Sequence, residues 1–266
     1  PRPLVVFPCG SISMTNTLCF ASARQADKLI AVVVFPTPPF WFAIAIILPI
    51  YSPIPTAFLI NVSRETLNLL KAYEASLCEW QQKMNLVSKN SLPEAWKRHF
   101  LDSMQLFSLL PKSAKIVYDF GSGAGFPGMV LAIMAKSETP YLKFKLVESI
   151  KKKTLYLNAV KELTGANVEI INERIENIRP QIADAITSRA MCALPDLLKY
   201  ARPFCGKKTK LIFLKGRSYE QELNTARNEW EFELEILPNQ ESDDGVILVI
   251  TGLHLSLIHI SEPTRP

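Results

Sequence analysis

Cysteine is scarce in this sequence, and its spacing argues against two kinds of site. The 266 residues contain five cysteines, none of which forms a C-x-x-C pair: Cys9, Cys19, Cys78, Cys192 and Cys205. Neither a disulfide framework nor a zinc site is therefore expected, and no metal centre is predicted. This use of cysteine suits the reducing cytoplasm, which is the location we expect.

A large excess of one charge is also missing. The chain has 30 Lys and Arg residues against 25 Asp and Glu residues, for a formal net charge of +5. This mildly basic balance is compatible with a nucleic-acid partner but does not require one. The length allows one large domain, or one domain with a smaller companion.

Charge is absent altogether between residues 29 and 63. Residues 1–60 as a whole hold nine of the 19 prolines. A membrane-spanning helix needs about 20 consecutive apolar residues. Prolines at positions 36, 38, 39 and 49 interrupt the apolar run 29–50 and would break such a helix. We therefore expect no membrane partner, with a genuine membrane anchor as the alternative.

The two ends of the chain differ from the middle. The sequence opens on Pro1, and residues 255–266 look like a translated sequencing-library adapter. We expect residues 1–60, an atypical apolar and proline-rich segment, and the tail 254–266 to be artefactual sequence. The remaining chain divides into an N-terminal helical segment, 61–112, and a ligand-binding domain, 113–253.

The chain is organised around residues 116–128. The apolar run Ile116–Phe120 predicts a buried strand, the glycines after it predict a tight turn, and residues 129–135 predict the start of a helix. Without side chains, such a turn lets a ligand approach backbone N–H groups closely. We therefore interpret this strand, loop and helix as a ligand-binding unit.

The glycine spacing fits two ligand classes. Gly123-x-Gly125-x-x-Gly128 matches the dinucleotide fingerprint, which alone is weak evidence. An acid followed by alternating glycines, from Asp119 through Gly121 to Gly125, matches the pattern of S-adenosylmethionine (SAM) methyltransferases. This acid, together with the proline at position 127, favours SAM as the cofactor.

Two helices are predicted upstream of this loop. Apolar residues recur every three or four positions after Ser63, a plausible N-cap, at Leu67, Leu70, Tyr73, Leu77, Trp80 and Met84. A second helix is predicted from Ser91, which together with Glu94 resembles a capping box. Both helices should pack on the domain that the glycine loop begins.

Downstream of the loop, predicted strands and helices alternate. Strands are expected at 144–148, 168–172, 185–188, 211–214, 232–237 and 246–251, and helices at 150–163, 194–201 and 220–229. Alternation of this kind predicts an α/β fold with a mostly parallel sheet. The last two strands have no helix between them and predict an antiparallel C-terminal hairpin, a methyltransferase trait.

Ligands of open α/β sheets bind at the carboxyl ends of strands. Glu148 ends one predicted strand and could accept hydrogen bonds from a ribose diol. Arg189 and Lys215 end two others, and we expect them to position a ligand or phosphate and not simply to pair with carboxylates. The run 151–153 puts three lysines at a helix N-terminus, against the helix dipole, so either RNA contact or a solvated face is possible. His99 lies on an apolar helix face, where a packed histidine is more common than a catalyst.

Several separated motifs together resemble the RsmG (GidB) family of small-subunit (16S) ribosomal RNA guanine-N7 methyltransferases. The resemblance covers residues 63–252 and rests on Asn85-Leu-Val-Ser88, Arg98-His-Phe-Leu-Asp-Ser103, Asp119-Phe-Gly-Ser-Gly-Ala-Gly-Phe-Pro-Gly128, Glu148-Ser-Ile-Lys-Lys-Lys153, Ser188-Arg-Ala190 and Leu214-Lys-Gly216. It implies a SAM-dependent, Rossmann-like methyltransferase fold. The implied partner is ribosomal RNA or the small ribosomal subunit, and we expect a monomer.

The resemblance and the glycine pattern together give a set of candidate residues. Candidates for SAM binding are Asp119, Gly121, Gly123, Gly125, Phe126, Glu148, Ile175, Glu176 and Arg189. Candidates for RNA binding, by resemblance, are Arg98, His99, Lys151, Lys152, Lys153 and Lys215. No catalytic residue is assigned beyond Arg189 and Lys215 as positioning groups.

Methylation of guanine N7 uses an in-plane lone pair, so no base has to remove a proton, and alignment is most of the task. No Asn-Pro-Pro-aromatic run, as amino-group methyltransferases use, follows the fourth strand of the domain. We predict a guanine unstacked from its loop and held beside residues 188–192, with Cys192 as a small packing residue. The alternatives are a SAM-dependent enzyme with another acceptor, an NAD-dependent oxidoreductase and a non-catalytic RNA-binding protein.

Overall fold

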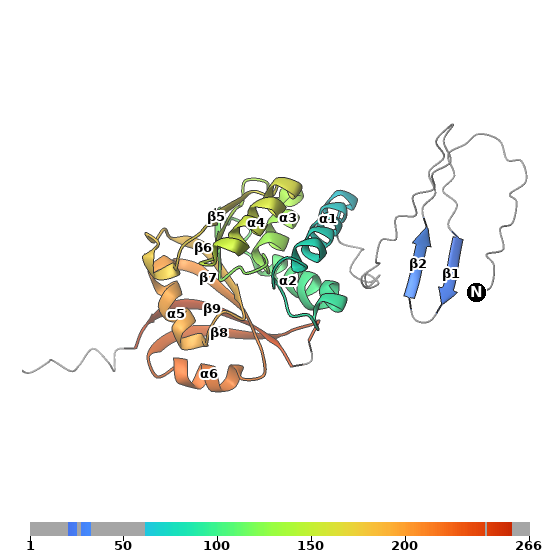
Figure 1. Cartoon of the computed structure of the whole chain (residues 1–266). Helices are drawn as coiled ribbons and strands as arrows, with labels where there is room; N and C mark the ends of the chain where they lie inside the picture. Colours follow the sequence, from blue (N-terminus) through green and yellow to red (C-terminus); the bar gives the residue numbers. More distant parts are fainter. Residues whose placement is uncertain (1–20, 26–27, 33–61, 243, 257–266) are drawn as a thin grey trace, which may run out of the picture. The chain divides into compact units, whose positions relative to one another are not determined.

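The computed structural model describes residues 21–25, 28–32, 62–242 and 244–256 (Figure 1). The chain divides into two units, Pro1–Pro53 and Ile54–Pro266. In the first unit, β1 (Ala21–Gln25) and β2 (Lys28–Val32) pair antiparallel. Within the described ranges no helix combines the length and hydropathy of a membrane span. Most of the uncharged stretch 29–63 and the tail 257–266 lie outside these ranges, so the expectations about them stay predictions.

The second unit contains a seven-stranded sheet in the order β5-β4-β3-β6-β7-β9-β8. The five strands β3 to β7 run parallel, and β9 runs antiparallel to both of its neighbours, β7 and β8. The predicted α/β fold with an antiparallel C-terminal hairpin is confirmed. The strands are β3 (Ile116–Phe120), β4 (Lys143–Val147), β5 (Val168–Ile171), β6 (Ala183–Arg189), β7 (Cys205–Lys215), β8 (Trp230–Pro238) and β9 (Val246–Leu255).

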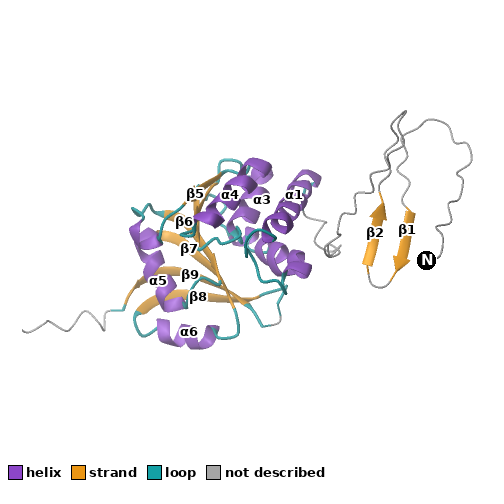
Figure 2. Ribbon diagram, in the orientation of Figure 1, coloured by secondary structure: helices purple, strands orange, loops and turns teal. Residues whose placement is uncertain are grey.

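Helices cover both faces of this sheet (Figure 2). One hydrophobic core lies between the sheet and α1 (Arg64–Gln81), α3 (Gly128–Glu138) and α4 (Lys151–Thr164). A second core lies under α5 (Leu194–Ala201) and α6 (Tyr219–Ala226). Because both faces are covered, most side chains of the central strands β3 and β6 are buried, including polar ones such as Asp119 and Thr187.

The amphipathic helix predicted after Ser63 is confirmed as α1. The Ser63 hydroxyl accepts a hydrogen bond from the Thr66 backbone N–H at 3.1 Å, which satisfies one of the free donors of the first turn. The predicted inner face is buried, with Leu70, Tyr73 and Leu77 fully inaccessible to solvent. The side chains that recur every three or four residues thus fix this helix against α3 and α4.

The capping box predicted at Ser91 is wrong. The Ser91 backbone is already helical (φ −91°, ψ −15°), whereas an N-cap is normally extended, and its side chain caps nothing. Its hydroxyl instead donates to the Ser88 carbonyl at 2.8 Å, and Glu94 forms an ion pair with Arg98. The second helix predicted from Ser91 is present as short helices of different kinds: η2 (Leu92–Glu94), the π-helix η3 (Trp96–Leu101), α2 (Asp102–Met104) and η4 (Phe107–Leu109).

Strand boundaries differ from the prediction mainly near the C-terminus. β7 begins at Cys205, six residues before the predicted 211, and β9 continues to Leu255. Leu255 pairs with Trp230, and the Ser256 N–H donates to the Glu229 carbonyl at 2.9 Å. The sheet therefore extends past residue 253, the predicted end of the domain. Two further short turns are η5 (Ile175–Asn177) and η6 (Arg202–Phe204).

Candidate functional site

A cleft of about 1030 Å³ opens at the carboxyl ends of the parallel strands. Its walls come from the glycine loop after β3, the loop after β6, the end of β7, the π-helix η3 and the loop between β8 and β9. This is the edge at which open α/β sheets bind ligands. Segments far apart in the sequence thus meet at one site.

The glycine loop has the backbone that its sequence predicts. Gly121, Gly123 and Gly125 all have positive φ values, of 67°, 57° and 97°. A Cβ on Gly121 would lie 2.6 Å from the Met191 side chain, and one on Gly125 would overlap the Tyr73 hydroxyl. Gly121 and Gly125 therefore have no space for a side chain, and the backbone at Gly121 and Gly123 lines the cleft.

Asp119 is fully buried behind this loop and does not line the cleft. Its carboxylate accepts hydrogen bonds from the Gly128 N–H at 3.2 Å and from the Thr187 hydroxyl at 2.8 Å. Burial raises its pKa to about 6, although these hydrogen bonds act in the opposite direction. Asp119 thus connects β3, β6 and the start of α3, and it shapes the loop from within.

Glu148 holds the same loop from the next strand. Its carboxylate accepts from the Gly123 N–H at 3.0 Å and from the Ile150 N–H at 2.7 Å. Each carboxylate oxygen can accept two hydrogen bonds, so both oxygens retain acceptor capacity. The residue is only 6% exposed and is not part of the cleft wall.

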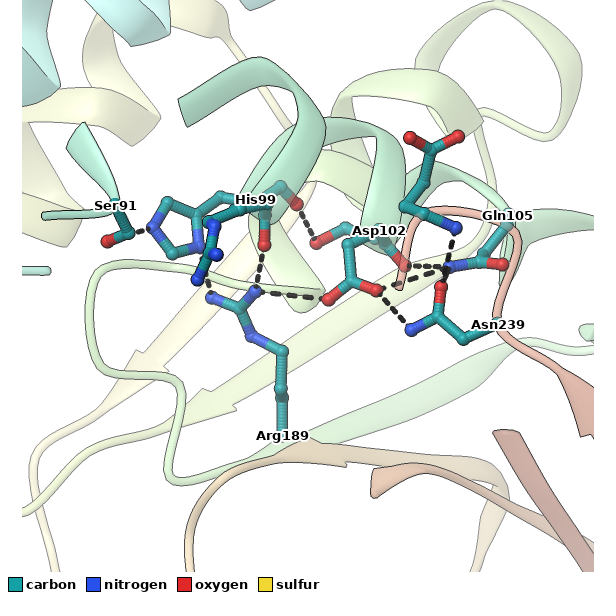
Figure 3. Close-up of polar contacts among 9 residues, drawn as sticks. Ser91, His99, Asp102, Gln105, Arg189 and Asn239 are labelled. Carbon is teal, nitrogen blue, oxygen red and sulfur yellow. Dashed lines mark hydrogen bonds and ion pairs between the residues drawn. The ribbon is translucent and has the colours of Figure 1, made fainter. Parts of the chain in front are cut away.

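Arg189, at the end of β6, is the centre of a polar network (Figure 3). Its guanidinium donates to the Arg98 carbonyl at 2.7 Å and forms an ion pair with Asp102 at 3.2 Å. It also lies over the Phe126 ring, 5.3 Å from the ring centre. Against expectation, Arg189 is paired with a carboxylate, and it joins the sheet to η3.

The network continues from Asp102 to the loop after β8. The Asn239 amide donates to the Asp102 carboxylate at 2.6 Å, and Gln105 donates to both residues, at 3.2 Å to Asp102 and 2.8 Å to Asn239 (Figure 3). Three segments of the cleft wall are therefore connected by hydrogen bonds. Asp102 lies inside a quoted motif, but its role was not predicted. Asn239 had no sequence signal because only the tertiary fold brings it to Asp102.

His99 is buried within this network and is 8% exposed. Its Nδ1 lies 2.9 Å from the Arg189 guanidinium, its Nε2 lies 2.9 Å from the Ser91 hydroxyl, and its ring stacks on Phe126. Burial, reinforced by the charge of Arg189, lowers its pKa to about 3. The packed histidine expected from the helix face is what the structure contains, and no ring nitrogen is left to contact RNA.

Lys215 is likewise engaged inside the protein. Its ammonium forms an ion pair with Glu222 at 2.7 Å and donates to the Cys192 carbonyl at 2.7 Å, and its side chain is 8% exposed. This contact holds the loop after β6, where Ala190 has a φ of 51°, a rare conformation for a residue with a Cβ. Burial raises the pKa of the Cys192 thiol to about 11, so the thiol is protonated at neutral pH.

The remaining candidates fall into two groups. Arg98 and Lys153 line the cleft, together with Lys97, which the sequence analysis did not single out. Lys97 and Lys153 belong to no ion pair among the residues that the structure describes. Outside the main cleft lie Lys151 and Lys152, both exposed, and Ile175 and Glu176, which line a separate cavity of about 190 Å³.

The comparisons of this sequence with known protein sequences agree on one family. The family model described as GidB, rRNA small subunit methyltransferase G, matches residues 66–242. The ribosomal RNA small subunit methyltransferase G of Parvibaculum lavamentivorans is 44% identical over 198 residues, covering 74% of this chain and 87% of the relative. Its counterpart in a Jannaschia species is 41% identical, covering 73% and 92%. A solved SAM-dependent methyltransferase from Aquifex aeolicus has a TM-score of 0.48 at 13% identity, covering 59% of this chain and 92% of that one.

Proposed function

The chain belongs to the rRNA small subunit methyltransferase G (GidB) family, and we propose that it transfers the methyl group of SAM to N7 of one guanine in small-subunit (16S) rRNA. The observation that carries the proposal is the glycine loop at the cleft. Three residues with positive φ bring its backbone to the cleft wall, at the ligand-binding edge of a sheet with an antiparallel final hairpin.

The residues of the cleft fit SAM. Gly121 offers backbone without a side chain, while Phe126 and Arg189 provide a ring and a cation beside it. Asp119, Gly125 and Glu148 support the loop from behind, and the predicted contact of Glu148 with a ribose diol is not assigned, because Glu148 does not line the cleft. We assign Gly121, Gly123, Phe126 and Arg189 to direct contact with SAM, and we leave Ile175 and Glu176 unassigned because they line a separate cavity. Bound SAM supplies an electrophilic methyl group on a sulfonium centre.

The polar side chains of the cleft wall, His99 and Lys215, are engaged in internal hydrogen bonds, and this agrees with methylation at a ring nitrogen. Guanine N7 attacks through a lone pair that carries no proton, so the enzyme mainly has to align donor and acceptor. His99 and Lys215 are held in internal hydrogen bonds, and we assign them to positioning the walls and not to proton transfer or RNA contact. The cleft is at the upper end of the ~300–1,000 Å³ range for small-molecule sites, which leaves room for a base beside the cofactor.

We assign RNA contact to the cations in and beside the cleft. The exposed Lys97 and Arg98 and the half-buried Lys153 line it, and the exposed Lys151 and Lys152 extend the positive surface along the first turn of α4. Phosphate neutralisation by lysine and arginine provides most of the affinity of such contacts. We further propose a cytoplasmic monomer that acts on rRNA or the small subunit.

The test is to incubate the full chain with methyl-labelled SAM and small-subunit rRNA, or subunits, that lack guanine-N7 methylation. Label is then mapped by strand cleavage at 7-methylguanine. RNA that already carries the modification serves as the control, because it should accept no label. One labelled guanine in the unmodified RNA is the expected result.

Other outcomes would change the assignment in defined ways. Binding of SAM with no label in RNA would contradict the rRNA substrate and indicate another methyl acceptor. Failure to bind SAM, with an absorbance change that depends on a nicotinamide cofactor, would replace the methyltransferase with an oxidoreductase.

A further inference from the structure

Tyr73, in the middle of α1, supports the glycine loop from the inside of the protein. Its side chain is fully buried, and its hydroxyl donates to the Ala124 carbonyl at 2.5 Å. Among the residues that the structure describes, no second donor reaches this carbonyl. A buried carbonyl without a partner is costly, so this hydrogen bond favours the observed path of the loop.

The ring of Tyr73 supports the next part of the loop. It stacks on Phe126, with ring centres 5.4 Å apart and planes 17° apart, and it contacts Phe100 edge-on at 5.2 Å. Phe126 in turn lines the cleft, whereas Tyr73 does not. The missing side chain of Gly125 is part of the same arrangement, because a Cβ there would overlap the Tyr73 hydroxyl.

We propose that Tyr73 is a positioning residue for the cofactor site. Its hydroxyl fixes Ala124 and its ring fixes Phe126, so that the loop presents Gly121 and Gly123 to the cleft in one shape. The proposal rests on the proposed function, since it takes SAM as the ligand of this loop. It also gives the N-terminal helix a part in cofactor binding that is separate from any contact with RNA.

The chain offers a matched control at Tyr156. This tyrosine is also fully buried, and its ring centre lies 6.4 Å from that of Tyr73. Its hydroxyl makes no hydrogen bond of normal geometry in the described part of the chain, and it lies close enough to the Tyr73 hydroxyl for the two groups to shift each other's pKa. Tyr73→Phe and Tyr156→Phe therefore remove the same atom from the same aromatic cluster, but only the first releases the loop.

The experiment measures SAM binding by calorimetry, steady-state KM values for SAM and RNA, and thermal melting of both variants. Tyr73→Phe should raise the Kd and KM for SAM about tenfold, since a lost hydrogen bond to a buried carbonyl is of that order. The KM for RNA should not change, and Tyr156→Phe should bind SAM like the wild type. Hydrogen exchange of amides 121–126 should accelerate in Tyr73→Phe alone.

Equal SAM affinity in the two variants would overturn the proposal, even if both melt at a lower temperature. Gly125→Ala disturbs the same contact from the loop and replaces Tyr73→Phe if that variant does not fold. It should also weaken SAM binding and leave the KM for RNA unchanged, and unaltered SAM affinity would again overturn the proposal. A wild-type chain that does not bind SAM would instead overturn the proposed function, so the two failures are distinguishable.

Discussion

The guanidinium of Arg189 donates a hydrogen bond to Nδ1 of His99 at 2.9 Å, and this contact fixes the tautomer of the histidine. Because Nδ1 accepts, the single ring proton is on Nε2, which donates to the Ser91 hydroxyl at 2.9 Å. The Ser91 hydroxyl in turn donates a hydrogen bond to the Ser88 carbonyl at 2.8 Å. A chain of donors thus runs from the end of β6 to the start of η2, and each acceptor in it is neutral.

This arrangement predicts that His99 does not titrate near neutral pH. Its pKa is lowered to about 3 in the folded protein, against about 6.5 in an unfolded chain. Between these values the unfolded state binds more protons, so the unfolding free energy should fall as the pH is lowered through this window. Nitrogen NMR of the imidazole should show a neutral ring from pH 5 to pH 8.

His99→Gln is the matched variant, because glutamine retains one acceptor and one donor but cannot titrate. The difference in unfolding free energy between wild type and His99→Gln should shrink as the pH falls from 6.5 towards 3. A ring that protonates near pH 6.5 would contradict the assigned network.

The ion pair between Arg189 and Asp102 should contribute to both stability and activity. Its side chains are only 19% and 11% exposed, so Asp102→Asn would leave a largely desolvated guanidinium without its counter-charge. We expect a loss of about 2–3 kcal/mol in unfolding free energy, measured by urea denaturation. Methyl transfer should also fall, since the cleft wall at Arg189 loses its connection to Asn239.

The control for this prediction is Glu94→Gln. It breaks the ion pair between Glu94 and Arg98, whose side chains are 59% and 61% exposed. Exposed pairs of this kind contribute about 0–1 kcal/mol, so this variant should denature close to the wild type. Equal losses in both variants would mean that the Asp102 pair has no special role.

Alanine variants of Gly121 and Gly252, which have nearly the same φ, distinguish an effect on cofactor binding from an effect of backbone strain. Gly121 and Gly252 have φ values of 67° and 66°, so alanine at either position costs about 1–2 kcal/mol of conformational strain. A Cβ at Gly121 would approach Met191 at the cleft, whereas one at Gly252 meets nothing within 4 Å. Gly121→Ala should lose more stability than Gly252→Ala because of the contact with Met191, and only Gly121→Ala should weaken SAM binding, by about tenfold or more. Calorimetric titration at a temperature where both are folded checks this, and equal SAM affinity would argue against the assigned loop.

The sequence predicted those parts of the fold that depend on local periodicity. The spacing from Leu67 to Met84 predicted α1, and the run before Asp119 predicted β3 with its glycine turn. The final hairpin followed from two strands without a helix between them. Each of these signals comes from residues close together in the chain, where propensity and burial act in the same direction.

The site depended on contacts that no local pattern encodes. His99 and Asp102 contact Arg189, which lies about 90 residues later in the chain, and at this point the backbone forms the π-helix η3 instead of a regular α-helix. The Ser91 side chain forms a hydrogen bond with His99 and does not cap a helix. The sequence predicts that Lys215 positions a ligand or phosphate, but in the structure Lys215 forms an ion pair with Glu222 on α6. Strand-end charges were thus located correctly by the sheet topology, while their partners required the tertiary structure.

The lysines at the start of α4 allow a direct test of RNA contact against a solvated face. Lys153 lines the cleft and belongs to no ion pair in the described part of the chain, whereas Lys161 lies in the last turn of the same helix, away from the cleft. If Lys153 neutralises a phosphate, Lys153→Ala should raise the KM for rRNA about fivefold and reduce the slope of log K against log salt by about 1. The Kd for SAM should stay unchanged, because the cation acts on the other substrate.

Lys161→Ala is the control: it removes the same charge from the chain and should alter neither constant. Equal effects of the two substitutions would mean that the helix contributes only general positive charge, and no effect of either would assign the lysine run to solvent.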